Sequence, residues 1–302
     1  MLLKNKRKWE IFSLEISLQE RAILLTGVSC LNLDETLDCG QCFRFVRQQD
    51  GSYRGIVRET LLHITALSTD SFLLEGTTLE EFENIWFDYF DLGLDYEALK
   101  ARYREDETMR RALCYAPGIR VLKQEPWEAL CTFIISQNNN IPRIKGIVER
   151  FCEAFGKPLG RGEYAFPTPE SICSKAPEDL SYLRAGFRAK YLIDAAQKVA
   201  SGELVLENLC NLPIDEARQA LQVVKGVGPK VCDCVLLYGL HRLDAFPVDV
   251  WIKRVLERFY PQGTPACIEG TQGIAQQYLF HYIRHLDEAE QKEEAKCAAT
   301  AM

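Results

Sequence analysis

The sequence contains no long hydrophobic run. In its 302 residues no 18 apolar residues follow one another, which excludes a predicted membrane-spanning helix. The opening residues mix basic and apolar side chains, with no continuous apolar stretch and no small-residue cleavage site behind them. A secretory signal has both a continuous apolar stretch and a small-residue cleavage site. We therefore expect a chain that is not secreted and has no membrane partner.

The 12 cysteines lack the spacing of a metal site. Cys39 and Cys42 form one C-x2-C pair, but no second pair completes a set of zinc ligands. The later cysteines are too scattered for the four-cysteine loop of an iron–sulfur cluster. They are Cys210, Cys232, Cys234, Cys267 and Cys297. We therefore expect reduced thiols in a cytoplasmic protein, with no metal, zinc or iron–sulfur site.

Acidic residues outnumber basic residues in this sequence, 43 to 36. The formal net charge is -7 and the isoelectric point is about 5.4. An acidic chain is not typical of a protein that binds nucleic acid, because phosphates attract a basic surface. Five of the 43 acidic residues, however, lie in residues 287–302, which we expect to form a charged C-terminal tail. The net charge therefore leaves room for a basic patch elsewhere.

The apolar pattern predicts an α+β fold. Short alternating segments at 42–48, 53–58 and 62–66 predict strands, and Asp50-Gly51 is typical of a hairpin turn. Later apolar residues recur at helical spacing. The predicted helices are 79–90, 127–135, 144–155, 189–200, 215–224, 229–240, 250–259 and 270–286. We expect an N-terminal antiparallel sheet domain at 1–110 and a larger all-helical domain at 111–286.

A glycine-rich turn joins two of these helices, so about 216–240 is predicted to form a helical hairpin. The turn is Gly226, Val227 and Gly228, and Pro229 begins the second helix, where its missing N–H is not needed. The N–H groups of such a turn can bind a DNA phosphate. The spacing is not that of a P-loop. The same kind of turn also joins helices in many folds that bind no DNA.

A lysine and an aspartate accompany the hairpin. Lys230 lies in the first turn of its second helix, where the helix dipole disfavours an ammonium group and favours a nucleophilic neutral amine. Asp249 follows Pro247 and precedes the helix at 250–259, which it is expected to cap. A carboxylate there can also stabilise positive charge on a sugar that is losing its base. Contact with phosphate for Lys230, and capping alone for Asp249, are the alternatives.

Together, residues 226–231 (GVGPKV) and 247–250 (PVDV) resemble the helix-hairpin-helix and aspartate signature of base-excision DNA glycosylases. A lysine at this place is typical of the bifunctional members, which also cleave the strand. Further segments between about 33 and 285 resemble the 8-oxoguanine DNA glycosylase family. These segments are 40–44, 137–152, 185–191 and 273–280. The resemblance implies excision of 8-oxoguanine, with damaged double-stranded DNA as the partner.

The resemblance also implies a base pocket. Gly40 matches the residue whose carbonyl accepts the N7 hydrogen of 8-oxoguanine, a hydrogen that guanine lacks. Cys234 and Phe280 would enclose the flipped base, and Gln276 would hydrogen-bond its Watson–Crick edge. A turn for Gly40, a core position for Phe280 and a solvated helix position for Gln276 are the alternatives.

A second implied set of residues fills the vacated stack and reads the opposite cytosine. It comprises Asn138, Arg143, Phe187 and Arg188. Phe187 stands where the eukaryotic members have tyrosine. Trp251 replaces a histidine that contacts phosphate, and Ile283 replaces the acidic residue that supports this histidine. These departures bear on that phosphate contact and on the strictness of the cytosine preference.

The implied mechanism uses no organic cofactor. Lys230 attacks C1′ and displaces the base, the Schiff base permits β-elimination, and Asp249 stabilises the cationic sugar and assists proton transfer. The resemblance allows a structural monovalent or divalent cation on the hairpin carbonyls. We expect a monomer, associated with the nucleoid if the source is prokaryotic. A glycosylase for oxidised pyrimidines and a non-catalytic DNA-binding module are the alternative functions.

Overall fold

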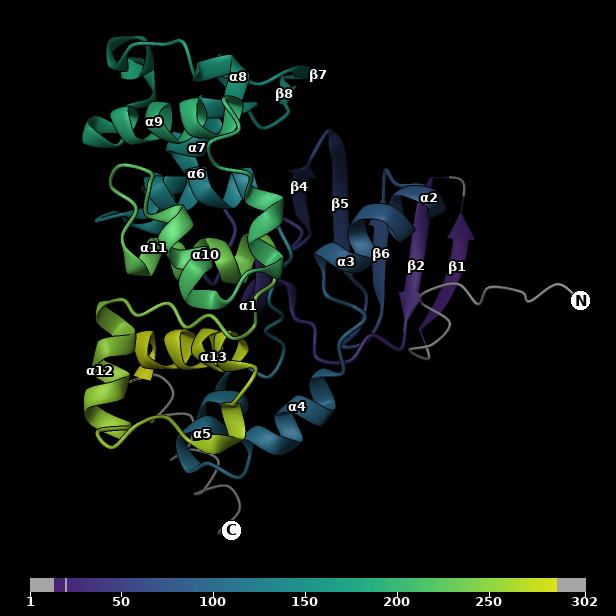
Figure 1. The fold of residues 1–302 in the computed structure, drawn as a ribbon. Coiled ribbons are helices and arrows are strands. Elements are labelled where there is room, and N and C mark those ends of the chain that lie inside the picture. The colour runs from purple at the N-terminus through teal and green to yellow at the C-terminus, as the bar shows by residue number, and fades with distance from the viewer. Residues whose placement is uncertain (1–13, 20, 287–302) are drawn as a thin grey trace, which may run out of the picture.

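The computed structural model describes residues 14–19 and 21–286. A β-sheet forms one side of the molecule and a larger assembly of helices forms the other (Figure 1). This arrangement confirms the predicted α+β fold class, with the sheet in the N-terminal part of the chain. No helix in the described ranges is long and apolar enough to cross a membrane.

Six strands make an antiparallel sheet in the spatial order β1-β2-β6-β5-β4-β3. They are β1 Glu15–Gln19, β2 Ala22–Thr26, β3 Val46–Arg47, β4 Tyr53–Val57, β5 Thr60–Ala66 and β6 Phe72–Glu75. Alternate residues of β2 and β6 are buried, as expected for a sheet with one covered face. Aromatic residues of the segment 82–90 join the strands in a smaller hydrophobic core. The sheet is therefore covered by the helical segment that follows it.

The strands differ from the predicted ones at several places. The sequence pattern does not predict β1, β2 or β6. The strand predicted at 42–48 forms only at β3, because neighbouring side chains enter different cores: Phe43 packs in the larger core, and Cys42 and Phe45 in the smaller one. The predicted turn at Asp50-Gly51 does join β3 to β4. The helical part also contains a short ribbon, β7 Pro158–Gly160 with β8 Glu163–Tyr164, so it is not all-helical.

The helices of the C-terminal part lie close to their predicted ranges. α9 (Ala189–Ala200) and α12 (Val250–Phe259) match them, whereas the helix predicted at 229–240 is α-helical only in α11 (Pro229–Cys234) and continues as the π-helix η6 (Val235–Gly239). The other α-helices are α1 Leu33–Leu37, α2 Leu79–Glu81, α3 Phe87–Tyr89, α4 Tyr96–Tyr103, α5 Glu107–Tyr115, α6 Pro126–Ser136, α7 Ile141–Phe155, α8 Pro169–Ile172, α10 Ile214–Leu221 and α13 Gln272–Arg284. The remaining segments are η2 Phe82–Trp86, η3 Pro177–Leu183, η4 Gly186–Arg188, η5 Leu206–Asn211 and η7 Ala266–Ile268.

Helices α4 and α5, which lie on either side of Asp106, pack into the larger core. Tyr103 and Met109 are completely buried there. The hydroxyl of Tyr103 donates to the carbonyl of Thr271, at the start of α13, over 3.0 Å. The hydroxyl of Tyr260, at the end of α12, donates to Asp106 Oδ1 over 2.6 Å. These bonds attach the two helices to the C-terminal pair α12 and α13.

A buried glutamine joins the N-terminal part to the helical part. Gln41 Nε2 donates to the carbonyls of Thr36 over 2.9 Å and Arg120 over 2.7 Å. Its Oε1 accepts the N–H of Leu122 over 2.9 Å, and its own carbonyl accepts from the Gln124 amide over 2.7 Å. Gln41 is completely buried. Each of these polar groups therefore depends on a protein partner.

We expect Gln41→Met to lower the free energy of unfolding by about 3 kcal/mol, because it removes the partner of one buried N–H and two buried carbonyls. Urea denaturation measures this change. Gln49→Met, in the exposed turn between β3 and β4, is the matched control and should change stability by less than about 0.5 kcal/mol. A Gln41→Met protein as stable as the wild type would contradict the importance of this network.

A buried carboxylate forms a second contact between the two parts. Glu128 Oε2 in α6 lies 3.7 Å from Arg44 Nη1, and both side chains are largely buried. Burial raises the pKa of Glu128 to about 7, although the charge of Arg44 acts in the opposite direction. Arg44 also donates to the carbonyl of Tyr164 over 2.5 Å. Glu128 therefore changes its charge near neutral pH in the folded protein.

Stability should consequently fall as the pH rises from about 4.5 to about 7. In this range the unfolded chain has already lost the proton of Glu128, whereas the folded protein still holds it. We expect Glu128→Gln to remove up to about 3 kcal/mol of this pH dependence, measured as the free energy of unfolding at several pH values. Glu170→Gln, at an exposed residue of α8, should leave the pH profile as it is. Identical profiles for Glu128→Gln and the wild type would refute the shifted titration.

Candidate active site

A cleft of about 780 Å³ lies where the hairpin, the N-terminus of α12 and the loop before α7 meet. Six of the residues predicted from the sequence line it: Gly40, Asn138, Gly228, Lys230, Asp249 and Phe280. The fold thus brings together residues that are more than 200 positions apart in the chain.

Lys230 lies at the start of α11, as its position after Pro229 predicts. Gly228 is the N-cap and Pro229 is the first helical residue. The Nζ atom of Lys230 lies 5.4 Å from the centre of the Phe133 ring, which belongs to α6 and also lines the cleft. An aromatic face attracts the ammonium form and holds the side chain in place. Lys230 is half-buried and lines the cleft.

Asp249 is the N-cap of α12, so the predicted capping role is present. Its Oδ1 accepts the N–H groups of Trp251 over 3.0 Å and Ile252 over 2.9 Å. Both bonds use the same oxygen, which leaves Oδ2 for a substrate. Capping and a function in the cleft are therefore compatible, because the helix cap fixes the carboxylate at the cleft wall.

Gly40 approaches Phe280 closely. A Cβ atom on Gly40 would lie 3.2 Å from Ile141 Cδ1 and 3.9 Å from Phe280 Cε1, and the residue has a φ of +93°. Both the positive φ and the narrow space favour glycine here. The backbone of the N-terminal part therefore reaches the wall of the cleft opposite α11.

Two predicted pocket residues are buried rather than exposed in the cleft. Cys234 is 2% and Gln276 is 4% exposed. Burial raises the pKa of the Cys234 thiol to about 11, and Lys230, which hydrogen-bonds to it, opposes that rise. Gln276 Oε1 accepts from the hydroxyl of Tyr238 over 3.4 Å. The shared face of Lys230 and Cys234 on α11 agrees with the i, i+4 spacing.

Sequence reasoning did not single out two aromatic residues of this site. Phe133 and Tyr238 stack with a centroid distance of 5.1 Å and an angle of 17° between their planes. Tyr238 also donates to Gln277 Oε1 over 2.5 Å. Phe133 precedes Gln137 by four residues, so helical spacing from the polar loop could have identified it. Tyr238 lies in the π-helix η6, where spacing by four is no guide.

The loop with Asn138 is held by an arginine. Asn138 is exposed and has a left-handed backbone with a φ of +49°. Arg188, only 3% exposed, donates to the carbonyls of Asn138 over 3.0 Å and Ala185 over 3.1 Å. It also donates to the Gln137 carbonyl over 2.9 Å. In this state Arg188 supports the loop through backbone carbonyls instead of facing solvent.

Two guanidinium groups lie near each other beside this loop. Burial and the charge of Arg143 lower the pKa of Arg188. Arg143 itself is exposed near the start of α7, where its N–H donates to the Asn140 side chain over 3.0 Å. Phe187 is half-exposed, and the Cζ atom of Arg188 lies 4.5 Å from the centre of its ring. The four residues predicted to fill the stack and read the opposite base therefore lie together.

The turn of the hairpin is packed against α9. A Cβ atom on Gly226, whose φ is +78°, would lie 2.4 Å from Tyr191 Cδ2. The N–H of Lys225 donates to Asp194 Oδ2 over 2.8 Å. Burial would raise the pKa of Asp194, but this bond and the nearby lysines lower it overall. By contrast, no atom lies within 4 Å of a Cβ placed on Gly228, so the turn is open there.

The C-x2-C cysteines are buried thiols that donate to the backbone. Cys39 Sγ donates to the Thr36 carbonyl over 3.3 Å, and Cys42 Sγ to the Leu37 carbonyl over 3.5 Å. Burial raises the pKa of Cys39 to about 11. Within residues 14–19 and 21–286, no three His, Cys, Asp or Glu side chains form a group that could hold a metal ion. Cys297 lies outside the described residues.

Comparison with known proteins decides the family. Residues 23–130 match the model of the 8-oxoguanine DNA glycosylase N-terminal domain, and residues 131–267 match that of HhH-GPD superfamily base excision DNA repair proteins. A solved structure of MBOgg1 in complex with a low affinity DNA ligand is 41% identical, with a TM-score of 0.86. The match covers 91% of this chain and 99% of that one.

This chain belongs to the 8-oxoguanine DNA glycosylase family. The Clostridium acetobutylicum 8-oxoguanine glycosylase/lyase, solved with DNA containing cytosine opposite 8-oxoG, is 35% identical with a TM-score of 0.85. That match covers 90% of this chain and 98% of the other. The N-glycosylase/DNA lyase of Saccharomyces cerevisiae is 41% identical over 158 residues, which are 47% of this chain and 42% of the yeast protein. The chain thus spans less than half of the yeast relative, and the family predicted from the sequence is confirmed.

Trp251 and Ile283, two of the positions expected to depart from the eukaryotic members of the 8-oxoguanine DNA glycosylase family, lie together. Trp251 at the start of α12 and Ile283 in α13 line the same cavity, which adjoins the cleft. Ile283 is buried, and the ring of Trp251 stacks with Arg254, whose Cζ lies 4.6 Å from the ring centre. An aromatic and aliphatic pair with a stacked arginine therefore lines this cavity.

Substitutions of two hairpin glycines test stability and DNA binding separately. We expect Gly226→Ala to lower the free energy of unfolding by about 2–4 kcal/mol, because its Cβ would collide with Tyr191 and its φ is positive. Gly228→Ala should leave stability within about 0.5 kcal/mol, since its Cβ meets open space. Its methyl group would stand at the open side of the turn and should weaken DNA binding roughly tenfold. Urea denaturation and fluorescence anisotropy measure the two effects; wild-type affinity of Gly228→Ala would argue against phosphate binding at this turn.

Proposed function

We propose that this chain is a bifunctional DNA glycosylase and AP lyase that excises 8-oxoguanine opposite cytosine from duplex DNA in base excision repair. One observation carries the proposal: Lys230, Asp249, Gly40 and Phe280 line a single cleft in a member of the 8-oxoguanine DNA glycosylase family. An amine, a carboxylate, a backbone carbonyl and an aromatic ring are the groups that this reaction needs.

The glycosylase step begins when the flipped nucleotide brings C1′ to Lys230. Once the ammonium group of Lys230 has given a proton to solvent, the Nζ lone pair forms the C–N bond as the bond from C1′ to the base breaks, and the electron pair of that bond leaves with the base. The positive charge that develops on the sugar faces Asp249, whose Oδ2 is not used by the helix cap. The ring of Phe133 keeps the amine at the cleft wall before the substrate arrives.

The lyase step follows from the amine on C1′. Opening of the sugar gives a Schiff base between Lys230 and C1′, which acidifies the protons on C2′. Removal of one C2′ proton expels the 3′ phosphate by β-elimination and cuts the strand 3′ to the lesion. Asp249, the carboxylate that lines the cleft, accepts this proton. Water then releases Lys230 from the imine.

Recognition of the lesion is proposed for the Gly40 side of the cleft. A carbonyl at this position would accept a hydrogen bond from N7–H of 8-oxoguanine and would face the N7 lone pair of guanine. The close approach of Gly40 to Phe280 supports contact with a base held against that ring. Loss of one buried hydrogen bond costs about 3 kcal/mol, so release of undamaged guanine should be roughly 100-fold slower or more.

The opposite base is proposed to be read beside the Asn138 loop. Asn138 and Phe187 are exposed and would enter the space that the flipped nucleotide leaves. Arg143 and Arg188, whose charges interact, would donate to the acceptors of cytosine. Arg188 must then exchange its bonds to the loop carbonyls for bonds to the base, which couples base reading to the position of Asn138.

The remaining parts of the proposal concern cofactors, assembly and compartment. The reaction needs no organic cofactor, because the side chains supply both nucleophile and proton acceptor. The hairpin can hold a structural cation: the Val224 carbonyl accepts the N–H of Val227 over 3.1 Å and keeps a second lone pair. The large apolar side chains exposed in the described ranges are spread over distant segments, which favours a monomer. The free thiols fit a reducing compartment such as the cytoplasm, where a prokaryotic enzyme would meet the nucleoid.

The decisive experiment follows base release and strand cleavage separately on duplexes that contain one 8-oxoguanine opposite C, A, G or T. We expect both activities opposite C and none on undamaged guanine. Activity confined to a duplex with thymine glycol would reject the proposed pocket and favour the oxidised-pyrimidine alternative. Tight binding with no base release from any lesion would make the chain a non-catalytic DNA-binding module.

Borohydride trapping identifies the nucleophile on the same duplex. The cleft offers two lysines, Lys230 in α11 and Lys253 in α12, so each serves as the control for the other. We expect Lys230→Gln to abolish the covalent protein–DNA complex and Lys253→Gln to retain it. The reverse pattern would transfer the nucleophile to Lys253.

A further inference from the structure

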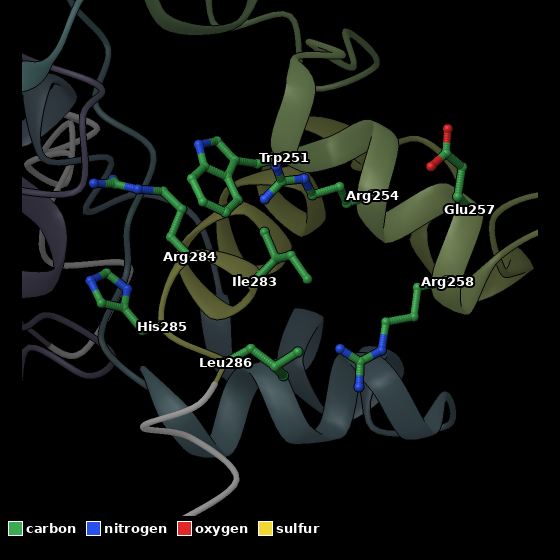
Figure 2. Close-up of a pocket in the computed structure, with 8 residues that line it drawn as sticks. All are labelled: Trp251, Arg254, Glu257, Arg258, Ile283, Arg284, His285 and Leu286. Atoms are coloured by element: carbon green, nitrogen blue, oxygen red, sulfur yellow. The ribbon is translucent and has the colours of Figure 1, made fainter.

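A second cavity adjoins the catalytic cleft. It has a volume of about 730 Å³ and lies between α12 and the C-terminal end of α13 (Figure 2). Trp251 and Arg284 line both cavities, so their side chains form the wall between them. We call it the Trp251 cavity; its other lining residues are Arg254, Glu257, Arg258, Ile283, His285 and Leu286.

The polar groups of the Trp251 cavity are mainly cationic. Arg254, Arg258 and Arg284 contribute three guanidinium groups, and Glu257 is the one carboxylate among the lining residues. Figure 2 shows the Glu257 carboxylate pointing away from the other labelled side chains. Such a concentration of arginine is unexpected in a chain with a net charge of -7. Guanidinium groups present forked N–H donors that fit a phosphate.

An aromatic ring lies beside each of these three arginines, and two of the rings also line the catalytic cleft. Arg254 follows Trp251 by three residues on α12, and its Cζ lies 4.6 Å from the centre of the indole ring. Arg284 Cζ lies 5.2 Å from the centre of the Phe280 ring, which lines the catalytic cleft. Stacking on a ring orders a guanidinium and leaves the N–H groups at its edge for a ligand. Ile283 lies beneath Trp251 and Arg254 in Figure 2 and offers neither arginine a carboxylate.

We infer that the Trp251 cavity binds a phosphodiester of the lesion-bearing strand just outside the flipped nucleotide. The inference rests on the proposed function, because a strand that delivers a nucleotide to the cleft must continue past the wall formed by Trp251 and Arg284. Phosphate contacts of this kind fix the register of a protein on the duplex and carry no base sequence. Arg254 binds the phosphate, and Trp251 is the positioning residue for Arg254.

Double-mutant cycles on binding test this contact. The probe is a duplex with a tetrahydrofuran abasic analogue, which cannot be cleaved, and with one uncharged methylphosphonate placed at each position in turn. On the unmodified probe we expect Arg254→Met to weaken binding roughly tenfold and to reduce the slope of log Kd against log salt by about 1. When the methylphosphonate replaces the phosphate that Arg254 contacts, outside the flipped nucleotide, Arg254→Met should change neither the affinity nor the salt slope. The negative charge that Arg254 binds is already absent from that probe.

Matched variants separate a local contact from a general loss of charge. Arg104→Met removes the same charge from the C-terminal end of α4, outside both cavities, and should weaken binding at most about twofold with additive effects at every position. Trp251→Ala should lose the coupling seen for Arg254. Trp251→Phe, which keeps a ring for Arg254 to stack on, should retain most of it.

Three results would overturn the inference. The first is additivity of Arg254→Met with every methylphosphonate, and the second is coupling confined to the phosphates of the flipped nucleotide, which belong to the catalytic cleft. The third concerns free deoxyguanosine monophosphate as a competitor of the duplex. If it displaces the duplex from the wild type but not from Arg254→Met, and Arg254→Met shows no coupling to any methylphosphonate, the cavity binds free nucleotides instead. Binding of the abasic probe requires no base excision. The phosphate contact can therefore be tested even if the protein does not excise 8-oxoguanine.

Discussion

A chain of buried hydrogen bonds between amide groups fixes the distance between the two walls of the catalytic cleft. The Gln41 side chain hydrogen-bonds to the segment at 120–124, and the Gln124 side chain donates to the carbonyl of Gln41. The backbone N–H of Gln124 then donates to the carbonyl of Tyr238, in the helix that continues from Lys230, over 2.8 Å. Gly40 therefore cannot move away from the hairpin helix without breaking buried hydrogen bonds, and the pocket keeps its width before DNA arrives.

A net charge of -7 is compatible with DNA binding because basic side chains gather at one place. Lys230, Lys253 and Arg284 line the cleft, and Arg254 and Arg284 line the Trp251 cavity. A local field near the reacting strand matters more than net charge, since salt screens distant groups within about 10 Å. Trp251 and Ile283 add no negative charge to this surface, and neither offers Arg254 a carboxylate partner.

Much of the site could be predicted from the sequence because its chemistry is local. The turn at 226–228, Lys230 after it and Asp249 before α12 each follow from rules about helix ends, and the structure places all three at one cleft. Residues whose roles depend on distant contacts were harder to predict. Strand β2 needs pairing with β6 about 50 residues later and β1 pairs in turn with β2, whereas Arg188 acts on carbonyls 50 residues earlier. Phe133 reads as ordinary core until α11 is known to cross α6.

The packing of α9 against the hairpin has a further consequence for the order of events on DNA. Phe187 meets Tyr191 edge to face, Tyr191 fills the space over Gly226, and Asp194 holds the N–H of Lys225. The ring that would enter the base stack and the amine that would attack the sugar thus belong to one stiff body. A single displacement of the DNA relative to the protein therefore brings the Phe187 ring into the base stack and the Lys230 amine to the sugar. The entropy lost in aligning this ring with this amine is lost once, during folding.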